Sequence, residues 1–149
     1  MDKKITTIAF ATDHAAAEVR GKVKEYLSRL GYEVLDFGYD GDGSCDYPDY
    51  AAKAAIAVAD GQAQKGVLIC GTGIGMSIVA NKIKGIIAAT VWNEDTARLA
   101  VQHNHADILC LGSRTSTLRE LCLMIKVFLD TEFEERHNER IAKIKELEK

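Results

Sequence analysis

The chain has 149 residues, with 47% hydrophobic and 28% charged side chains and a formal net charge of −3 at pH 7. This length and composition are typical of a single globular domain, which we expect to span residues 1–149. A weakly acidic chain without a Lys/Arg-rich block is not typical of nucleic-acid binders, so the expected partner is a small molecule. The longest uncharged run, residues 66–81, is shorter than the roughly 20 residues of a membrane span, and no signal-like apolar region precedes Asp13. We therefore expect no membrane partner and a cytoplasmic location.

Short apolar runs alternate with amphipathic stretches along the chain. The expected strands are 5–11, 32–37, 66–70, 85–91 and 107–112, and the expected helices are 15–30, 48–60, 74–83 and 94–103, followed by helix to the end. Strands that are apolar throughout and joined by helices indicate a parallel sheet covered on both faces, with right-handed crossovers. We therefore expect an α/β fold: a Rossmann-like three-layer sandwich with a five-stranded parallel sheet, order 2-1-3-4-5, and a C-terminal helix.

That C-terminal helix includes a highly charged segment, residues 131–149. Its few apolar residues, among them Phe133, Ile141, Ile144 and Leu147, have mixed helical spacing. The pattern predicts a surface helix or a helix that contacts another subunit.

The expected strand order also predicts where a ligand binds. In open parallel sheets, ligands bind beyond the carboxyl ends of the strands where the winding reverses, here between the first and third strands. The first strand leads into Asp13 and His14, and the third ends at Cys70. An acid, an imidazole and a thiol should therefore meet in one crevice.

The third strand runs into a glycine-rich loop, GVLICGTGIGMS at residues 66–77. Glycines at 71, 73 and 75 allow a tight turn that points several N–H groups into one concavity suited to negative charge. A plain tight turn is the simpler alternative. A dinucleotide-binding loop is another, since Glu94 or Asp95 follows about 20 residues on. However, the third glycine position of that motif is Met76, and the loop follows the third strand instead of the first.

Cys70 stands at the mouth of this loop and beside an expected helix N-terminus, two features that favour a thiolate. A thiolate there can act as a base or a nucleophile, and His103 or His105 is the candidate partner. The other cysteines, at 45, 110 and 122, fit buried or incidental thiols. We expect no metal site, because the cysteines and histidines lack zinc-like spacing.

Five segments together carry a family resemblance: ATDH at 11–14, DYPDYA at 46–51, LICGTGIGMSIVANK at 68–82, QHNHADILCLGSR at 102–114 and RHNERI at 136–141. Over essentially its full length the chain resembles ribose-5-phosphate isomerase B, in the family shared with the galactose-6-phosphate isomerase subunits. The resemblance implies an aldose–ketose isomerase without metal or cofactor, which interconverts ribose 5-phosphate and ribulose 5-phosphate through an enediolate.

The resemblance also implies roles for individual residues. Cys70 would remove the C2 proton, Thr72 would shuttle a proton between O1 and O2, and His103 would open the sugar ring. The loop amides would stabilise the enediolate, an effect worth about 3–4 kcal/mol for a good donor; they belong to Gly71, Thr72, Gly73, Ile74 and Gly75. Asp13 and His14 would hold sugar oxygens. Tyr47 would line the same pocket, or else pack beside Pro48.

The phosphate would be bound by Arg114, Arg136 and Arg140. Without the resemblance, Arg136 and Arg140 are only an exposed i, i+4 pair among glutamates. The resemblance implies a homodimer or tetramer with shared sites, in which Cys70 and His103 come from one chain, while Asn104 and the two C-terminal arginines come from its partner.

The chain departs from the family pattern at a few positions. Ala15 and Ala16 replace two glycines, Ile87 replaces an arginine, and Glu134-Glu135 replaces a pair of glycines before the C-terminal arginine. With Cys70 and Gly75, the chain resembles the branch that uses a cysteine base. Two alternatives stay open: an isomerase of a six-carbon sugar phosphate, such as allose or galactose 6-phosphate, and a non-catalytic nucleotide- or flavin-binding module.

Overall fold

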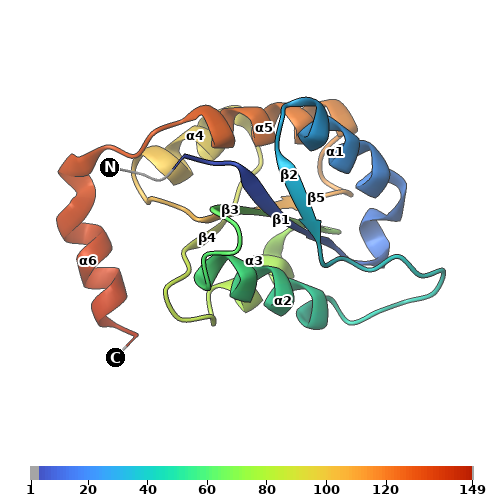
Figure 1. Cartoon of the computed structure of the whole chain (residues 1–149), viewed down its shortest axis with the longest axis horizontal. Coiled ribbons are helices and arrows are strands. Elements are labelled where there is room, and N and C mark those ends of the chain that lie inside the picture. The colour runs from blue at the N-terminus through green and yellow to red at the C-terminus, as the bar shows by residue number, and fades with distance from the viewer. Residues whose placement is uncertain (1–3, 149) are drawn as a thin grey trace.

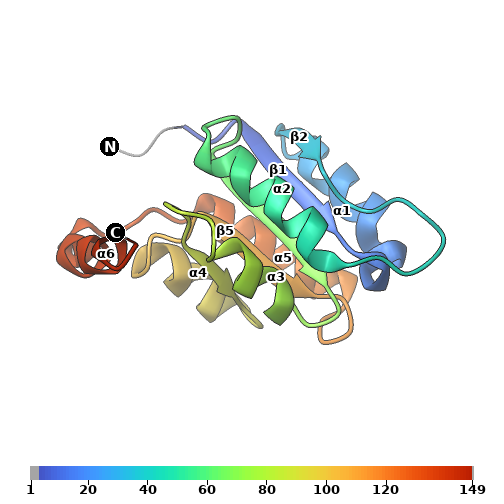
Figure 2. The same ribbon diagram turned by 90° about the horizontal axis from the view of Figure 1, so that it is seen from below.

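A five-stranded parallel sheet forms the centre of the computed structural model, which describes residues 4–148 (Figure 1). The strands are β1 (Thr7–Thr12), β2 (Glu33–Asp36), β3 (Lys65–Cys70), β4 (Ala88–Thr90) and β5 (Ile108–Gly112). One face is covered by α1 (Ala17–Arg29), α4 (Glu94–Gln102) and α5 (Leu118–Asp130), and the other by α2 (Tyr47–Ala59) and α3 (Ile74–Ala80) (Figures 1 and 2). The expected α/β class with its parallel sheet is confirmed.

The order of the last two strands differs from the expected 2-1-3-4-5. The sheet has the order β2-β1-β3-β5-β4. Every residue of β5 is buried, whereas β4 has three residues, two of them partly exposed. The longer, fully apolar strand therefore takes an interior position beside β3, where helices cover both faces, and the short one takes the edge. The reversal of winding between β1 and β3 is unaffected.

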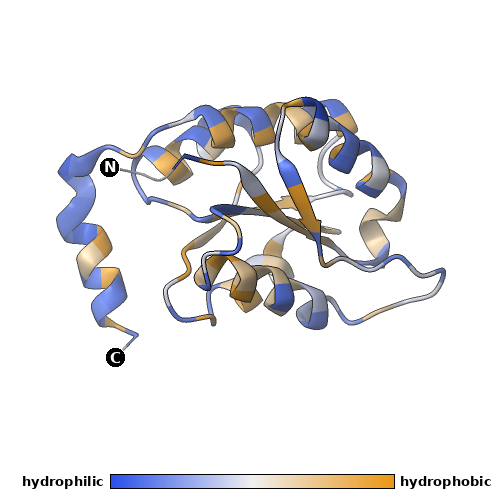
Figure 3. Ribbon diagram, in the orientation of Figure 1, coloured by the Kyte–Doolittle hydropathy of each residue, from blue (hydrophilic) through white to orange (hydrophobic). Residues whose placement is uncertain are grey.

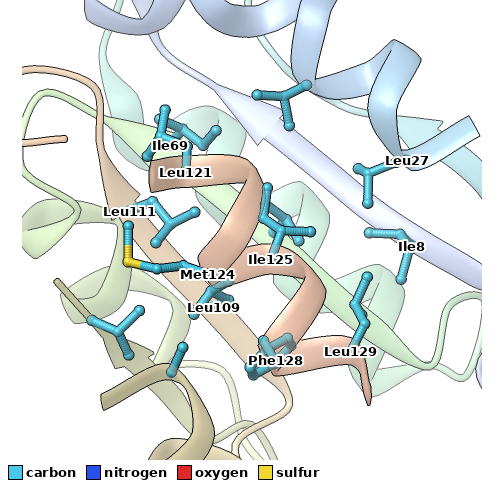
Figure 4. Close-up of a cluster of buried hydrophobic side chains, with 14 of the residues drawn as sticks. Ile8, Leu27, Ile69, Leu109, Leu111, Leu121, Met124, Ile125, Phe128 and Leu129 are labelled. Atoms are coloured by element: carbon cyan, nitrogen blue, oxygen red, sulfur yellow. The ribbon is translucent and has the colours of Figure 1, made fainter. Parts of the chain in front are cut away.

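The two faces of the sheet are packed with side chains of different size. On one face, α5 places bulky residues on β1, β3 and β5 at helical spacing (Figure 4): Leu121, Met124, Ile125, Phe128 and Leu129. On the other, α2 packs through the small residues Ala51, Ala54 and Ala55. Figure 3 shows apolar residues along the sheet and on the inner faces of these helices. No helix within residues 4–148 is long and apolar enough to cross a membrane.

The chain after β5 is not one continuous helix as expected. It forms α5, an extended stretch at 131–134, a 3-10 turn η2 (Glu135–His137) and then α6 (Asn138–Glu146). Thr131 ends α5 in an extended conformation, and its hydroxyl donates to the carbonyl of Val127 at 2.6 Å. A hydroxyl bonded to the last turn competes with continued helix.

The short helix α6 stands apart from the three layers, at the end from which β1 starts (Figures 1 and 2). Ile141 is buried, but Ile144 and Leu147 are exposed. Within the described chain, the apolar minority of this charged helix is thus only partly covered, which fits either a surface helix or a helix that contacts another subunit.

Candidate active site

An open cleft lies beyond the carboxyl ends of β1 and β3, where the winding of the sheet reverses. Its volume is about 410 Å³, and it is lined by Asp13, His14, Ala15, Tyr47, Cys70, Gly71, Thr72, Ile74, Gly75, Ile78 and Arg114. The predicted acid, imidazole and thiol therefore do share one crevice.

A second hollow, of about 260 Å³, opens near the starts of β3 and β5 and includes Lys65, Lys84 and Asp107 in its lining. Of the residues singled out from the sequence only His105 lines it. The His105 ring stacks on Phe133, with ring centroids 4.1 Å apart, and it lines this hollow instead of the cleft that contains Cys70. The chemistry is therefore assigned to the cleft that holds the thiol.

Cys70 ends β3 and is 5% exposed. The backbone N–H of Gly73 donates to its Sγ at 3.1 Å, so the sulfur sits against an amide donor. Such a hydrogen bond stabilises negative charge on the sulfur. Burial raises the pKa of the Cys110 thiol on the neighbouring strand, which keeps that group neutral.

Ser113 fixes the loop around Cys70 and was not singled out from the sequence. Its hydroxyl lies 2.9 Å from the carbonyl oxygen of Ala15 and 3.1 Å from that of Cys70. Its backbone N–H also donates to the Cys70 carbonyl at 2.8 Å. The residue therefore joins the turn that follows β1 to the ends of β3 and β5. The only signal in the sequence was its place in the Gly-Ser-Arg motif at 112–114.

Gly73 is the glycine whose conformation the loop requires. Its φ is +82°, and a Cβ there would lie 3.0 Å from backbone atoms of Leu111. Gly61 has a matching φ of +81° with no atom within 4 Å of the corresponding Cβ. A side chain at Gly61 would therefore meet backbone strain alone, whereas one at Gly73 would meet the same strain and a steric clash.

We expect Gly73→Ala to lower the free energy of unfolding by more than Gly61→Ala. Each substitution pays about 1–2 kcal/mol for the left-handed backbone. Gly73→Ala adds about 1–3 kcal/mol because the Leu111 backbone must shift, and it should also reduce turnover. Urea unfolding of both variants measures the difference. Equal losses would show that the loop does not depend on the close approach to β5.

Asp13 and His14 are held by the backbone. Asp13 is 6% exposed and its Oδ1 accepts from the Ala15 N–H at 3.0 Å, capping the 3-10 turn η1 (His14–Ala16). Nδ1 of His14 accepts from the N–H of Cys45 at 3.2 Å. In the neutral ring the proton is then on Nε2. Cys45, whose thiol was expected to be incidental, thus orients the imidazole through its backbone N–H. Burial raises the pKa of the Cys45 thiol.

Tyr47 and Arg114 frame the mouth of the cleft. A Cβ on Gly75 would lie 2.6 Å from the Tyr47 ring, so the ring lies over the glycine loop and lines the cleft. The N–H of Arg114 donates to the Gly71 carbonyl at 3.0 Å, and the Arg114 side chain is in contact distance of Gly71. An exposed guanidinium at this position is suited to a phosphate.

Five predicted site residues are absent from the lining of this cleft: Gly73, whose N–H is bonded to the Cys70 sulfur, and His103, Asn104, Arg136 and Arg140. His103 follows the last residue of α4, just before β5 begins. Because a crossover helix returns the chain to the starting edge of the sheet, His103 and Cys70 lie at opposite ends of β5, which spans about 17 Å for five residues. The expectation that one chain supplies both Cys70 and His103 to one site is therefore corrected.

His103 instead joins a group at the opposite edge. Its Nε2 lies 3.9 Å from Oε1 of Glu134, and its ring centroid is 4.6 Å from that of His137. Nε of Arg136 donates to Oε2 of Glu134 at 2.9 Å, which lowers the pKa of that carboxyl group. Burial, together with the positive charge of Arg136, lowers the pKa of His137.

Comparisons with known proteins match the chain over almost its whole length. Residues 8–144 match the family described as Ribose/Galactose Isomerase. The chain is 38% identical over 142 residues to ribose-5-phosphate isomerase B of Escherichia coli, which covers 95% of each chain. The structure of the Clostridium thermocellum ribose-5-phosphate isomerase B is similar, with a TM-score of 0.93, 42% identity and coverage of 96% of this chain and 97% of that one. The Mycoplasma genitalium ribose-5-phosphate isomerase B, solved with bound ribulose-5-phosphate, has a TM-score of 0.91 and 40% identity, with 96% of each chain covered.

Proposed function

Because the chain belongs to the ribose/galactose isomerase family, whose members isomerise sugar phosphates, we propose that it interconverts D-ribose 5-phosphate and D-ribulose 5-phosphate in the cytoplasm. The observation that carries the proposal is the buried Cys70 sulfur, which accepts from Gly73 in a cleft that also holds Asp13 and His14. The bound ribulose-5-phosphate of the Mycoplasma genitalium relative, 40% identical, supports the choice of a pentose. The four free cysteines are compatible with a reducing compartment.

The proposed reaction moves two protons. The Cys70 thiolate removes the proton from C2 of the open aldose. The C–H electrons form the C1–C2 double bond of an enediolate while the π electrons of the C1 carbonyl move to O1. The backbone N–H groups of Gly71, Thr72 and Gly75 stabilise the negative charge on oxygen, each good donor contributing about 3–4 kcal/mol. In the same loop, the N–H groups of Gly73 and Ile74 donate to Cys70 Sγ and Thr72 Oγ1. The Thr72 hydroxyl moves a proton from O2 to O1, and the thiol then protonates C1. Asp13 and His14 hold the sugar, and Arg114 binds the phosphate.

We further propose that the complete site contains residues of two chains. One chain supplies the Cys70 cleft, and its partner supplies His103 as the acid that opens the furanose ring, Asn104, and the phosphate ligands Arg136 and Arg140. Exposed apolar side chains lie at both places: Ile74 and Ile78 beside the cleft, and Ile144 and Leu147 on α6. A two-fold dimer would cover both and create two identical sites.

A panel of phosphorylated sugars tests the substrate. We expect kcat/KM for ribose 5-phosphate to exceed that for allose 6-phosphate and galactose 6-phosphate by at least about tenfold, because a pocket fitted to five carbons must displace contacts to admit a sixth. A coupled spectrophotometric assay of both reaction directions gives the ratios. A preference for a hexose phosphate would reject the pentose assignment, and saturable flavin binding without isomerisation of any sugar would reject the isomerase.

A further inference from the structure

The group formed by His103, Glu134 and His137 brings three metal-binding side chains together. One ligand atom from each lies within 4.8 Å of the others. The residues come from two segments, His103 at the end of α4 and the stretch 134–137. These segments are tied by a hydrogen bond, because the N–H of Glu134 donates to the carbonyl of Gln102 at 3.0 Å. The arrangement is therefore built by the fold and is not a feature of one exposed helix.

The donor set and spacing suit a late transition metal. Two imidazole nitrogens and one carboxylate oxygen are a common ligand set for Zn²⁺. Tetrahedral Zn²⁺ holds nitrogen at about 2.0–2.1 Å, so its neighbouring ligands lie about 3.4 Å apart. His103 and Glu134 are 38% and 36% exposed, so their side chains have room to close the present spacing.

His137 gives a second, independent indication. Its imidazole is 6% exposed, and its Nε2 meets no hydrogen-bond partner among residues 4–148. An unsatisfied buried polar atom costs about 1–3 kcal/mol. A metal bond would satisfy this nitrogen, and a ligand atom of the same ring lies within 4.8 Å of those of His103 and Glu134.

The carboxylate of Glu134 is already oriented for such a role. Its Oε2 accepts from Arg136, while its Oε1 is the oxygen on the side of His103. Hydrogen bonds of this kind fix the position of a ligating carboxylate and strengthen metal binding.

We propose that His103, Glu134 and His137 bind one Zn²⁺ per chain, with a fourth position open to water. The metal would occupy the lone pair of His103 and so inhibit ring opening. The inhibition rests on the proposed function, whereas the binding does not.

Calorimetric titration of the metal-free protein with ZnCl₂ tests the binding, and the visible absorption of Co²⁺ reports the ligand geometry. We expect one saturable site per chain. Glu134→Gln and His137→Asn should each weaken binding by at least about tenfold. Two matched controls should bind Zn²⁺ within about twofold of wild type. One is Glu135→Gln, which changes an adjacent exposed carboxylate. The other is His105→Asn, because asparagine tolerates the φ of 53° at that position.

The proposal is overturned if Glu134→Gln binds Zn²⁺ as tightly as Glu135→Gln does. It is also overturned if Cys45→Ser abolishes binding while His137→Asn retains it, because the metal would then sit at the His14–Cys45 pair, where Nδ1 and Sγ are 3.8 Å apart. Circular dichroism and thermal unfolding of the metal-free variants check the fold, and Glu134→Gln, with its partly exposed side chain, keeps the test valid if His137→Asn fails to fold. If Zn²⁺ binds here without lowering turnover of the cyclic substrate, the metal site is supported and the role of His103 in ring opening is rejected.

Discussion

Replacing Cys70 by serine lowers turnover of ribose 5-phosphate by at least about 100-fold, because a positioned general base contributes about 10²–10⁴-fold and a hydroxyl is a far weaker base than a thiolate. The serine oxygen can still accept from the Gly73 N–H, so the loop should keep its shape. Affinity for the sugar phosphate should change little, since Arg114 and the glycine loop are untouched. Steady-state kinetics and calorimetric binding measure the two effects separately.

Cys122→Ser is the matched control. Cys122 lies half-buried on α5, among the helices of the face away from α2 and α3, and burial raises the pKa of its thiol. The same loss of one sulfur there should leave turnover near normal. Retention of more than about a tenth of wild-type turnover by Cys70→Ser contradicts the assignment of Cys70 as the base.

Mixing inactive Cys70→Ser subunits with inactive His103→Asn subunits restores about a quarter of wild-type activity if sites are shared. In a mixed dimer, one site carries both changes and the other carries neither. With random assortment about half of the dimers are mixed, and each has one good site of two. The experiment requires unfolding and reassembly of the mixture, with wild type treated in the same way to measure recovery.

Asp13→Asn provides the contrasting mixture. Asp13 lines the same cleft as Cys70, so a mixed dimer of Cys70→Ser and Asp13→Asn has one defect in each site and should recover nothing. If the His103→Asn mixture recovers no activity while wild type does, both residues serve the site from one chain and the two-chain arrangement is wrong.

The fold and the cleft were predictable because they depend on local patterns. Fully apolar strands joined by amphipathic helices leave few alternatives to a covered parallel sheet. The reversal point then places Asp13, His14 and Cys70 together whether β4 or β5 lies next to β3. The exchange of those two strands depends on the brevity and exposure of β4, which an apolar run at 85–91 does not reveal.

The position of His103 could have been predicted by following the direction of its helix. A helix that precedes a strand ends at the edge where that strand begins, and this is the edge away from Cys70. The contact between His14 and Cys45 had no such signal, because the two are 31 residues apart and joined through a loop without periodicity. The end of α5 at Thr131, whose hydroxyl donates to the Val127 carbonyl, carries no glycine or proline signal in the sequence.

The alanines on the buried face of α2 have a consequence for the size of ligand that the cleft admits. Small side chains at Ala51, Ala54 and Ala55 allow the axis of α2 to lie close to the sheet. Tyr47 is the first residue of that helix, and its ring lies over Gly75. The size of these buried side chains, none of which lines the cleft, therefore affects how close Tyr47 lies to the glycine loop. Substrate range can shift through interior methyl groups as well as through the lining of the cleft.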